Sequence, residues 1–362
     1  MWTRRATIAS GLAAVGCASV AESPVRIAHP LVIAHRGASG YRPEHTRAAY
    51  RLAIAQGADF IEPDLVVSKD GVLFARHENE ISETTDIAAR PEFAARRTTK
   101  EIDAKPVSGW FTEDLTAAEL KTLRCRERLP QLRPGNAAFD GQEAIPTFDE
   151  VCALAAAESK RLGRTIGVYP ETKHPSYFAS IGLSFDQPLL GALRRHDLDR
   201  ADAPVFVQSF ETGNLKRLAR LTRAPLIQLL AEDGMPFDHL HTSMGLTYAA
   251  MVRGDGLRLI ATYAAGIGPQ KTMIVPRDGA GRAMPATDLV ARAHDVGLKV
   301  HPWTFRNENY FLPADLRRGD ATAPDFQRLP GDGLAELKQF FALGVDGVFA
   351  DFPDMAVAAR DR

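Results

Sequence analysis

Two carboxylates, Glu62 and Asp64, lie two residues apart within a largely apolar stretch. If this stretch is a strand, both side chains lie on one face and repel each other unless a proton or a cation neutralises them. Oxygen ligands suit a hard divalent cation, Mg²⁺ or Ca²⁺. Glu171, which ends a later apolar run, is the candidate third ligand. A Glu-x-Asp pair taken alone is more often two solvated carboxylates.

Histidines and cations follow runs of the same kind. His35 and His77 each come directly after an apolar run. With ordinary pKa values near ~6.5, a pair of histidines can remove one proton and supply another. Arg36 and Lys173 would place positive charge against the non-bridging oxygens of a phosphodiester. Isolated residues of these types are usually structural or surface groups, so a site requires a fold that brings them together.

Two further residues are candidates for binding a substrate. Gln208 ends another apolar run, and Trp303 follows the pair His301-Pro302. The indole of Trp303 could form an apolar wall for a small polyol, and a buried core tryptophan is the alternative.

Short apolar, β-branched runs alternate with helical segments, which is typical of a parallel sheet covered by helices. Because the carboxyl ends of parallel strands meet at one edge, the candidate residues would converge there. The alternation favours a barrel or an open doubly wound sheet. We predict eight strands, at Leu31–Ala34, Phe60–Val66, Val72–Arg76, Ile166–Pro170, Pro204–Gln208, Pro225–Leu230, Leu298–Trp303 and Val345–Ala350.

Helix starts are marked by three threonines. Thr46 precedes a segment with helical periodicity, and Thr116 with Glu119 and Thr147 with Glu150 have the spacing of a capping box. Two long segments exceed what one crossover needs, and we interpret them as insertions. The larger, about 78–145, follows the third predicted strand and contains Trp110-Phe111, and the smaller, 231–271, follows the sixth.

Composition limits the class of protein. A chain of 362 residues with 45% hydrophobic content can form one large core, and barrels of roughly 250 residues with insertions reach this size as one domain. The formal net charge is -1, with 44 basic and 45 acidic residues interspersed. No extended field of one sign is available for nucleic acid or an anionic membrane, so an anionic small molecule must be met by local charge.

The first residues have the pattern of an export signal. Arg4-Arg5 precedes an uncharged, mostly apolar run over 6–16, and Ser19-Val20-Ala21 has the small-residue pattern of a cleavage site. We therefore predict a signal peptide over 1–21 and a mature domain over 22–362. The alternative to a signal peptide is a frayed amino terminus of a cytoplasmic protein. No stretch approaches ~18 apolar residues, so no membrane span is expected.

The type of signal stays open between two patterns. Thr3-Arg4-Arg5 fits a twin-arginine signal, whereas Gly16-Cys17 fits a lipoprotein site with a lipid anchor on Cys17. Either pattern predicts an exported protein, periplasmic or secreted. In an oxidising compartment Cys125 and Cys152 could pair, and structural thiols are the alternative.

A set of motifs covers nearly all of the mature chain. The motifs are His35-Arg36-Gly37-Ala38-Ser39-Gly40, Pro43-Glu44-His45-Thr46, Glu62-x-Asp64, His77, Glu171-x-Lys173, Gln208-Ser209-Phe210, Gly268-Pro269-x-Lys271 and Pro302-Trp303-Thr304. Together they resemble the glycerophosphodiester phosphodiesterase family, and the long segment after His77 is similar to the exported, periplasmic-type branch of that family.

The resemblance implies a (β/α)₈ TIM barrel of the phospholipase C-like phosphodiesterase type. It also implies metal-dependent hydrolysis of glycerophosphodiesters to sn-glycerol 3-phosphate and an alcohol. One Ca²⁺ or Mg²⁺ ion would be held by Glu62, Asp64 and Glu171. His35 and His77 would be the acid-base pair, with cations near the phosphate at Arg36 and Lys173.

Two departures from the family pattern are Glu78, where Asp is common, and Arg47, where an apolar residue is usual. Neither is expected to touch a predicted ligand.

One alternative function is a lysophospholipase D-like or sphingomyelinase D-like hydrolase. The acyl chain of its substrate would need an apolar groove, which the segment bearing Trp110-Phe111 could supply. The other is a secreted binding protein on an inactive barrel.

Overall fold

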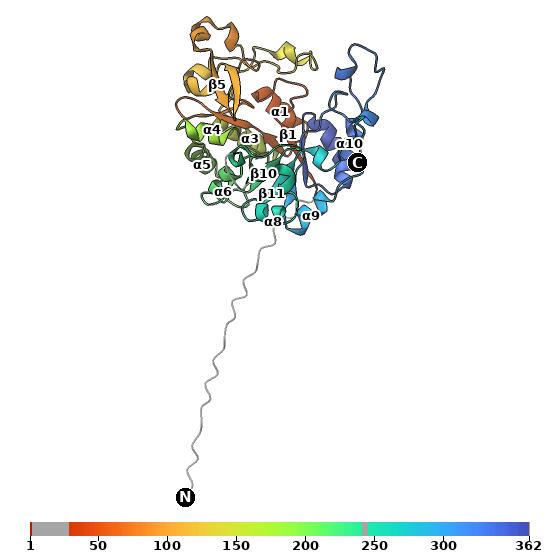
Figure 1. The fold of residues 1–362 in the computed structure, drawn as a ribbon. Coiled ribbons are helices and arrows are strands. Elements are labelled where there is room, and N and C mark those ends of the chain that lie inside the picture. The colour runs from red at the N-terminus through yellow and green to blue at the C-terminus, as the bar shows by residue number, and fades with distance from the viewer. Residues whose placement is uncertain (2–28, 241–244, 362) are drawn as a thin grey trace.

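The computed structural model describes Met1 and residues 29–240 and 245–361. Apart from Met1, the predicted signal peptide, with Cys17, lies outside these ranges. Within them, eight parallel strand positions form a ring covered by helices (Figure 1), which confirms the predicted TIM barrel. In order they are β1 (Leu31–His35), β2 with β3 (Phe60–Glu62, Asp64–Val67), β7 with β8 (Gly167–Val168, Glu171–Thr172), β9 (Val207–Ser209), β10 (Leu226–Leu230), β11 (Gly266–Pro269), β12 (Lys299–Val300) and β13 (Gly347–Ala350).

The ring closes where β1 pairs in parallel with both β2 and β13. Between the last two strands, Asp346 N donates to Val300 O at 2.9 Å and Phe349 N donates to Pro302 O at 3.1 Å. The helices are α1 (Arg47–Ala55), α2 (Ala117–Leu120), α3 (Phe148–Leu162), α4 (Pro175–Ser180), α5 (Asp186–Arg195), α6 (Thr212–Leu218), α7 (Tyr248–Met251), α8 (Gly256–Ala261), α9 (Leu289–Asp295), α10 (Gly333–Ala342) and α11 (Pro353–Arg360).

Alternation along the strands separates two cores. Val32 and Ala34 belong to the larger apolar cluster, which includes residues of the covering helices. Leu31 and Ile33, which alternate with them in β1, belong to a smaller cluster contributed by several strands, which fills the barrel interior. Its members are Leu31, Ile33, Phe60, Tyr169, Phe206, Ile227 and Phe349.

The prediction that Val72–Arg76 is the third strand of the barrel was wrong. The structure places β4 (Leu73–Ala75) antiparallel to β3, with only a tight turn between them. A parallel connection needs a dozen or more residues, so this short link allows only a hairpin. The insertion that follows therefore lies between the second and third positions of the barrel.

The segment 231–271 is also not an insertion. It contains α7, α8 and the missed barrel strand β11, which pairs in parallel with β10 and β12. The sequence of β11 is Gly-Ile-Gly-Pro, and glycine and proline have low strand propensity. The apolar residues shortly before it form helix α8.

The segment about 78–145 carries an antiparallel hairpin of β5 (Thr98–Ile102) and β6 (Lys105–Gly109), at the top of Figure 1. Trp110 and Phe111 do not form an exposed groove. Trp110 is 9% exposed and its Nε1 donates to Phe93 O at 2.7 Å, and Phe111 is fully buried.

Cys125 and Cys152 are buried free thiols. No helix in the described ranges is long and apolar enough to cross a membrane.

Candidate active site

Strand register brings the predicted residues to one end of the barrel. His35 is level with Glu62 on the next strand, and Glu171 is level with both Asp64 and Gln208 on its two sides. Five of the seven residues of the interior cluster are followed, two positions later, by a polar group on the same face. Ile33 thus precedes His35, and Phe60 precedes Glu62.

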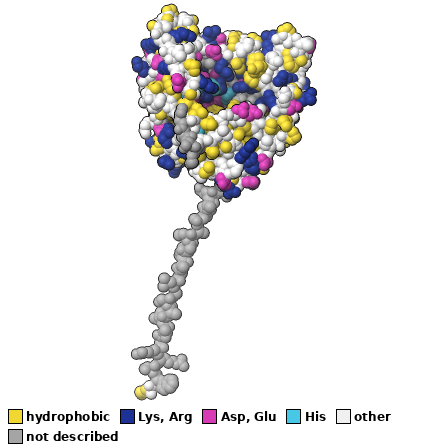
Figure 2. All heavy atoms as spheres, in the orientation of Figure 1, with side chains coloured by type: hydrophobic (Ala, Val, Ile, Leu, Met, Phe, Trp, Pro, Cys, Tyr) yellow, Lys and Arg dark blue, Asp and Glu magenta, His cyan; other side chains and the backbone are white. Residues whose placement is uncertain are grey.

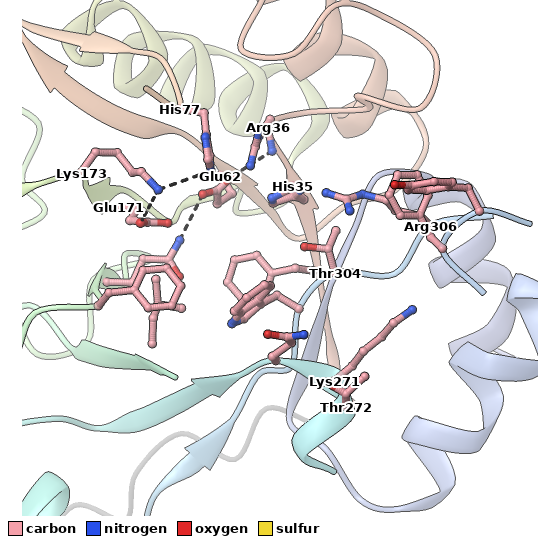
Figure 3. A pocket seen from close by; sticks show the side chains of 18 of the residues that line it. His35, Arg36, Glu62, His77, Glu171, Lys173, Lys271, Thr272, Thr304 and Arg306 are labelled. Carbon is pink, nitrogen blue, oxygen red and sulfur yellow. Dashed lines mark hydrogen bonds and ion pairs between the residues drawn. The ribbon is translucent and has the colours of Figure 1, made fainter. Parts of the chain in front are cut away.

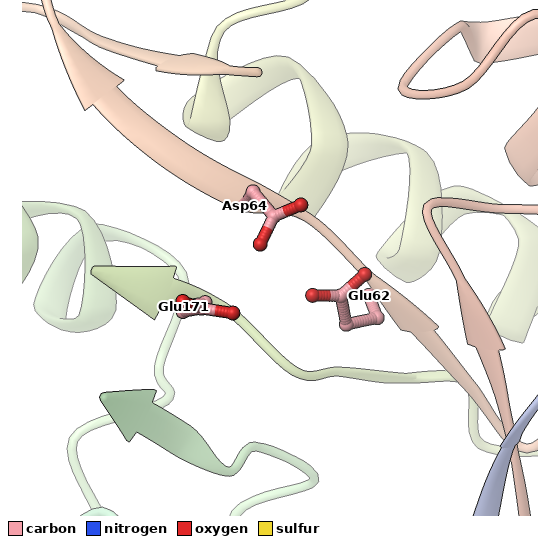
Figure 4. A group of neighbouring side chains, drawn as sticks. All are labelled: Glu62, Asp64 and Glu171. Carbon is pink, nitrogen blue, oxygen red and sulfur yellow. The ribbon is translucent and has the colours of Figure 1, made fainter. Parts of the chain in front are cut away.

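Three buried carboxylates form a cluster at this end. Figure 4 shows Glu62 and Asp64 from one strand and Glu171 from its neighbour pointing toward one another, and one oxygen from each lies within 4.8 Å of the others. Burial, followed by the charge of Asp64, raises the pKa of Glu62 well above its usual range. Burial also raises the pKa of Glu171 to about 8, although Lys173 opposes this. The cluster could hold a metal ion.

Cations and hydrogen-bond donors orient these carboxylates. The Arg36 backbone N–H donates to Glu62 Oε2 at 2.8 Å, and Gln208 Nε2 donates to Glu62 Oε1 at 3.1 Å. Lys173 Nζ lies 3.0 Å from Glu171 Oε1, and Arg36 Nε lies 3.2 Å from Asp64 Oδ2. The two cations therefore flank the cluster, where they can also meet a phosphate (Figure 3).

His35 is held by a buried carboxylate. Its Nδ1 donates to Asp351 Oδ1 at 2.6 Å, and Asp351 Oδ2 accepts from Arg133 Nη2 at 2.6 Å and Arg306 Nε at 2.9 Å. Burial, followed by the charge of Arg36, lowers the pKa of His35 to about 4. The ring is therefore neutral, with its proton on Nδ1 and its Nε2 able to accept.

His77 has the same arrangement of ring nitrogens. Its Nδ1 lies 2.8 Å from Glu78 Oε1, and Lys173 Nζ donates to its Nε2 at 3.4 Å. Burial, then Arg36 and Lys173, lower its pKa to about 3. Glu78, one of the two departures from the family pattern, is the partner that orients His77.

A cavity of about 460 Å³ opens beside the cluster, and Figure 2 shows Lys, Arg and His side chains in the hollow on this face. Eight of the nine predicted residues line it, and Asp64 lies behind them. Trp303 is part of the wall, where it meets Phe210 edge to face at 5.7 Å and donates through Nε1 to Gly268 O. Further lining residues that the sequence did not single out as binding groups include Lys271, Arg277, Thr304, Arg306, Tyr310 and Phe311.

Asp351 is the main residue that sequence reasoning missed. It follows the inner residue Phe349 by two positions, so the alternation that identified Glu62 would also have identified it. Arg306 follows Trp303-Thr304 closely, but nothing in the local pattern indicates that its guanidinium turns toward His35.

The comparisons with known proteins agree with this geometry. Residues 35–355 match the model of the glycerophosphoryl diester phosphodiesterase family. Glycerophosphodiester phosphodiesterase GDPD6 of Arabidopsis thaliana is 35% identical over 91% of this chain and 86% of its own length. A glycerophosphodiester phosphodiesterase of Haemophilus influenzae is 27% identical over 90% of this chain and 88% of its own.

Solved structures share the fold. A phosphodiesterase of the same family description from Silicibacter pomeroyi superposes with a TM-score of 0.62 at 20% identity, over 91% of this chain and 94% of its own. An Oleispira antarctica phosphodiesterase, solved with the product sn-glycerol-3-phosphate, gives 0.59 at 20% identity, over 92% and 98%. With the family model covering most of its length, this chain belongs to the glycerophosphoryl diester phosphodiesterase family.

Proposed function

We propose that this enzyme hydrolyses glycerophosphodiesters to sn-glycerol 3-phosphate and an alcohol, using one Ca²⁺ or Mg²⁺ ion. The observation that carries the proposal is the meeting of three buried carboxylates, two carboxylate-supported histidines and two cations at one end of the barrel, around one pocket. The product bound to the Oleispira antarctica phosphodiesterase of the same fold supports this choice of substrate.

The carboxylate cluster fits a hard cation. All three predicted ligands offer oxygen, and burial, with the neighbouring carboxylates adding to it, raises the pKa values of Glu62 and Glu171. A bound divalent ion would supply Lewis-acid polarisation of the phosphate. Glu62, Asp64 and Glu171 would hold it.

The protein's own groups supply charge and proton transfer. Arg36 and Lys173 stabilise the negative charge that develops on the phosphate oxygens. One histidine takes the proton of the attacking hydroxyl, which belongs to water or to the neighbouring glycerol hydroxyl. The other gives its proton to the alcohol oxygen as the phosphorus–oxygen bond breaks. A phosphate anion beside His35 or His77 favours the protonated ring, so substrate binding can load the acid.

The central experiment measures release of sn-glycerol 3-phosphate from glycerophosphocholine by the purified enzyme. EDTA is expected to abolish the release, and added Mg²⁺ or Ca²⁺ to restore it. Full activity after exhaustive chelation would contradict the metal assignment. Lysophosphatidylcholine serves as the comparison substrate, and faster cleavage of it would favour the lysophospholipase D-like alternative.

Export is part of the proposal and is supported by the amino-terminal sequence alone. Arg4-Arg5, the apolar run after it and Ser19-Val20-Ala21 are the features that favour it. Amino-terminal sequencing of the mature protein from a cell fraction distinguishes the three outcomes. Cleavage after Ala21 supports an ordinary or twin-arginine signal, a lipid-modified Cys17 supports an anchor, and an intact terminus contradicts export.

A further inference from the structure

His77 is supported by residues that lie outside the barrel strands. We propose that Asp103 and His174 are positioning residues for His77, so that the hairpin of the insertion completes the active site. The inference rests on the proposed function, because it concerns the proton-transfer role of His77 in that reaction. It assigns a role to a part of the insertion that the family motifs do not include.

A continuous chain of contacts links the hairpin to His77. Asp103 Oδ2 lies 2.6 Å from His174 Nδ1, and His174 Nε2 lies 2.9 Å from Glu78 Oε2. The other oxygen of Glu78 lies 2.8 Å from His77 Nδ1. We call these four residues the relay. They come from the turn between β5 and β6, the loop before α4 and the loop after β4.

The central ring of the relay is a cation. Both nitrogens of His174 face carboxylate oxygens, so both must donate, and only the protonated ring can do that. Burial opposes this charge, but the hydrogen bonds to Asp103 and Glu78 raise the pKa of His174 to about 9. His174 therefore holds the two acidic side chains together, which would otherwise repel each other.

Backbone geometry places the two outer members. Asp103 has a φ of +48° in the hairpin turn, and His174 has a φ of +46° directly before Pro175, the first residue of α4. Residues other than glycine rarely adopt such left-handed conformations, which are retained where the surroundings impose them. Each side chain therefore leaves a defined turn rather than a freely moving loop.

The relay has a chemical consequence for His77. When Glu78 accepts from Nδ1, the proton of the neutral ring stays on Nδ1 and the lone pair stays on Nε2, which faces the pocket. Lys173 lies beside that Nε2 and can only donate to it. The Glu78 side chain is 48% exposed, so without His174 it has room to leave His77. The ring would then lose the tautomer and orientation that proton transfer requires.

His174→Gln and Asp103→Asn test the inference. Loss of a residue that orients another usually costs about 10- to 100-fold, and we expect each change to lower kcat about 10-fold. KM for glycerophosphocholine and metal affinity by calorimetry should stay within about twofold of wild type, because neither residue contacts the pocket. His196→Gln is the matched control, since His196 pairs with Asp149 at 2.9 Å and does not line the pocket. Lys105→Gln on the same hairpin is a second control.

The decisive arm repeats His174→Gln in a His77→Ala background. A residue that acts only through His77 has nothing left to position there, so kcat should not fall further. A second drop of about 10-fold in that background, or normal kcat in both single variants, would overturn the inference. If His174→Gln does not fold by its melting curve, Asp103→Asn carries the same test. A wild-type enzyme that hydrolyses no glycerophosphodiester with either metal would instead contradict the proposed function.

Discussion

His35 and His77 face the same pocket, but different regions of the molecule orient them. The partner of His35, Asp351, ends a barrel strand, is 2% exposed and is fixed by two arginines. The partner of His77, Glu78, lies on a loop, has a side chain that is 48% exposed and is fixed by His174. The two rings have the same tautomer for the same reason, but one support belongs to the core and the other to the surface.

This difference indicates how each support is coupled to stability. A buried carboxylate between two guanidinium groups is part of the folded core, and its removal leaves uncompensated buried charge. A half-exposed carboxylate can be lost with little effect on folding, since water replaces its partners. The buried support should therefore couple activity to stability at His35, whereas the half-exposed support should separate them at His77.

The largest effects should come from the two rings themselves. His35→Ala and His77→Ala should each lower kcat by at least about 100-fold, because general acid-base groups contribute about 10² to 10⁴. Steady-state release of sn-glycerol 3-phosphate measures this. A p-nitrophenyl diester of glycerol phosphate needs no protonated leaving group, so the variant that lacks the acid should lose less on it. Near-normal turnover of either variant would remove that histidine from the mechanism.

Removing the two partners tests the comparison directly. Asp351→Asn should lower kcat roughly 100-fold, at the upper end of what loss of an orienting partner costs, and should cost about 3–5 kcal/mol of unfolding free energy. Glu78→Gln should lower kcat about 10-fold and cost less than about 1 kcal/mol. Denaturant unfolding and kinetics on the same preparations give both quantities. Equal losses of stability would erase the distinction between core and surface support.

The carboxylate cluster lies between Asp351 and Glu78, and its metal affinity should not depend on either residue. Because burial raises the pKa of Glu171 to about 8, a proton competes with the metal ion below that pH. Metal affinity should rise with pH and level off above about 8, with roughly a tenfold change per unit for each proton displaced. Calorimetric titrations at several pH values check the slope. Glu78→Gln should give the same profile, and a changed profile would show that the relay acts on the metal site.

The smallest expected effect is the pH dependence of the relay's stability. The pKa of His174 is about 9 in the folded protein, above the ordinary value of 6.5. A raised folded-state pKa stabilises in full below about 6.5, and the contribution disappears as pH rises through about 9. The Tm difference between wild type and His174→Gln should therefore be largest near pH 6 and shrink toward pH 10. A difference that grows with pH would show that the ring is not charged.

Much of the fold was predictable because local and global signals agree. Thr46 accepts from Ala49 N at the start of α1, and capping boxes form at Thr116 and Thr147 as predicted. The strand errors have physical causes. A short apolar run predicts a strand but does not distinguish a hairpin strand from a barrel strand. The glycines of β11 have low strand propensity, so this strand forms only because of its tertiary packing.

The part of the site that strand alternation and register place was predictable, and the part that depends on contacts between distant loops was not. Glu62, Asp64, Glu171 and Gln208 are placed by strand alternation and register, which the sequence pattern reflects. The relay, in contrast, depends on a hairpin turn meeting a loop 71 residues further along the chain. No periodicity relates Asp103 to His174, so only the folded structure brings them together.

The pairing of β1 with β13 gives His35 a partner from the far end of the chain, 316 residues away. This is the seam at which the ring of strands closes. A folding intermediate that has all strands but the last would already contain Glu62, Asp64 and Glu171, yet His35 would lack its proton-fixing carboxylate. Turnover thus reports completion of the ring, and recovery of activity during refolding should lag behind recovery of metal binding.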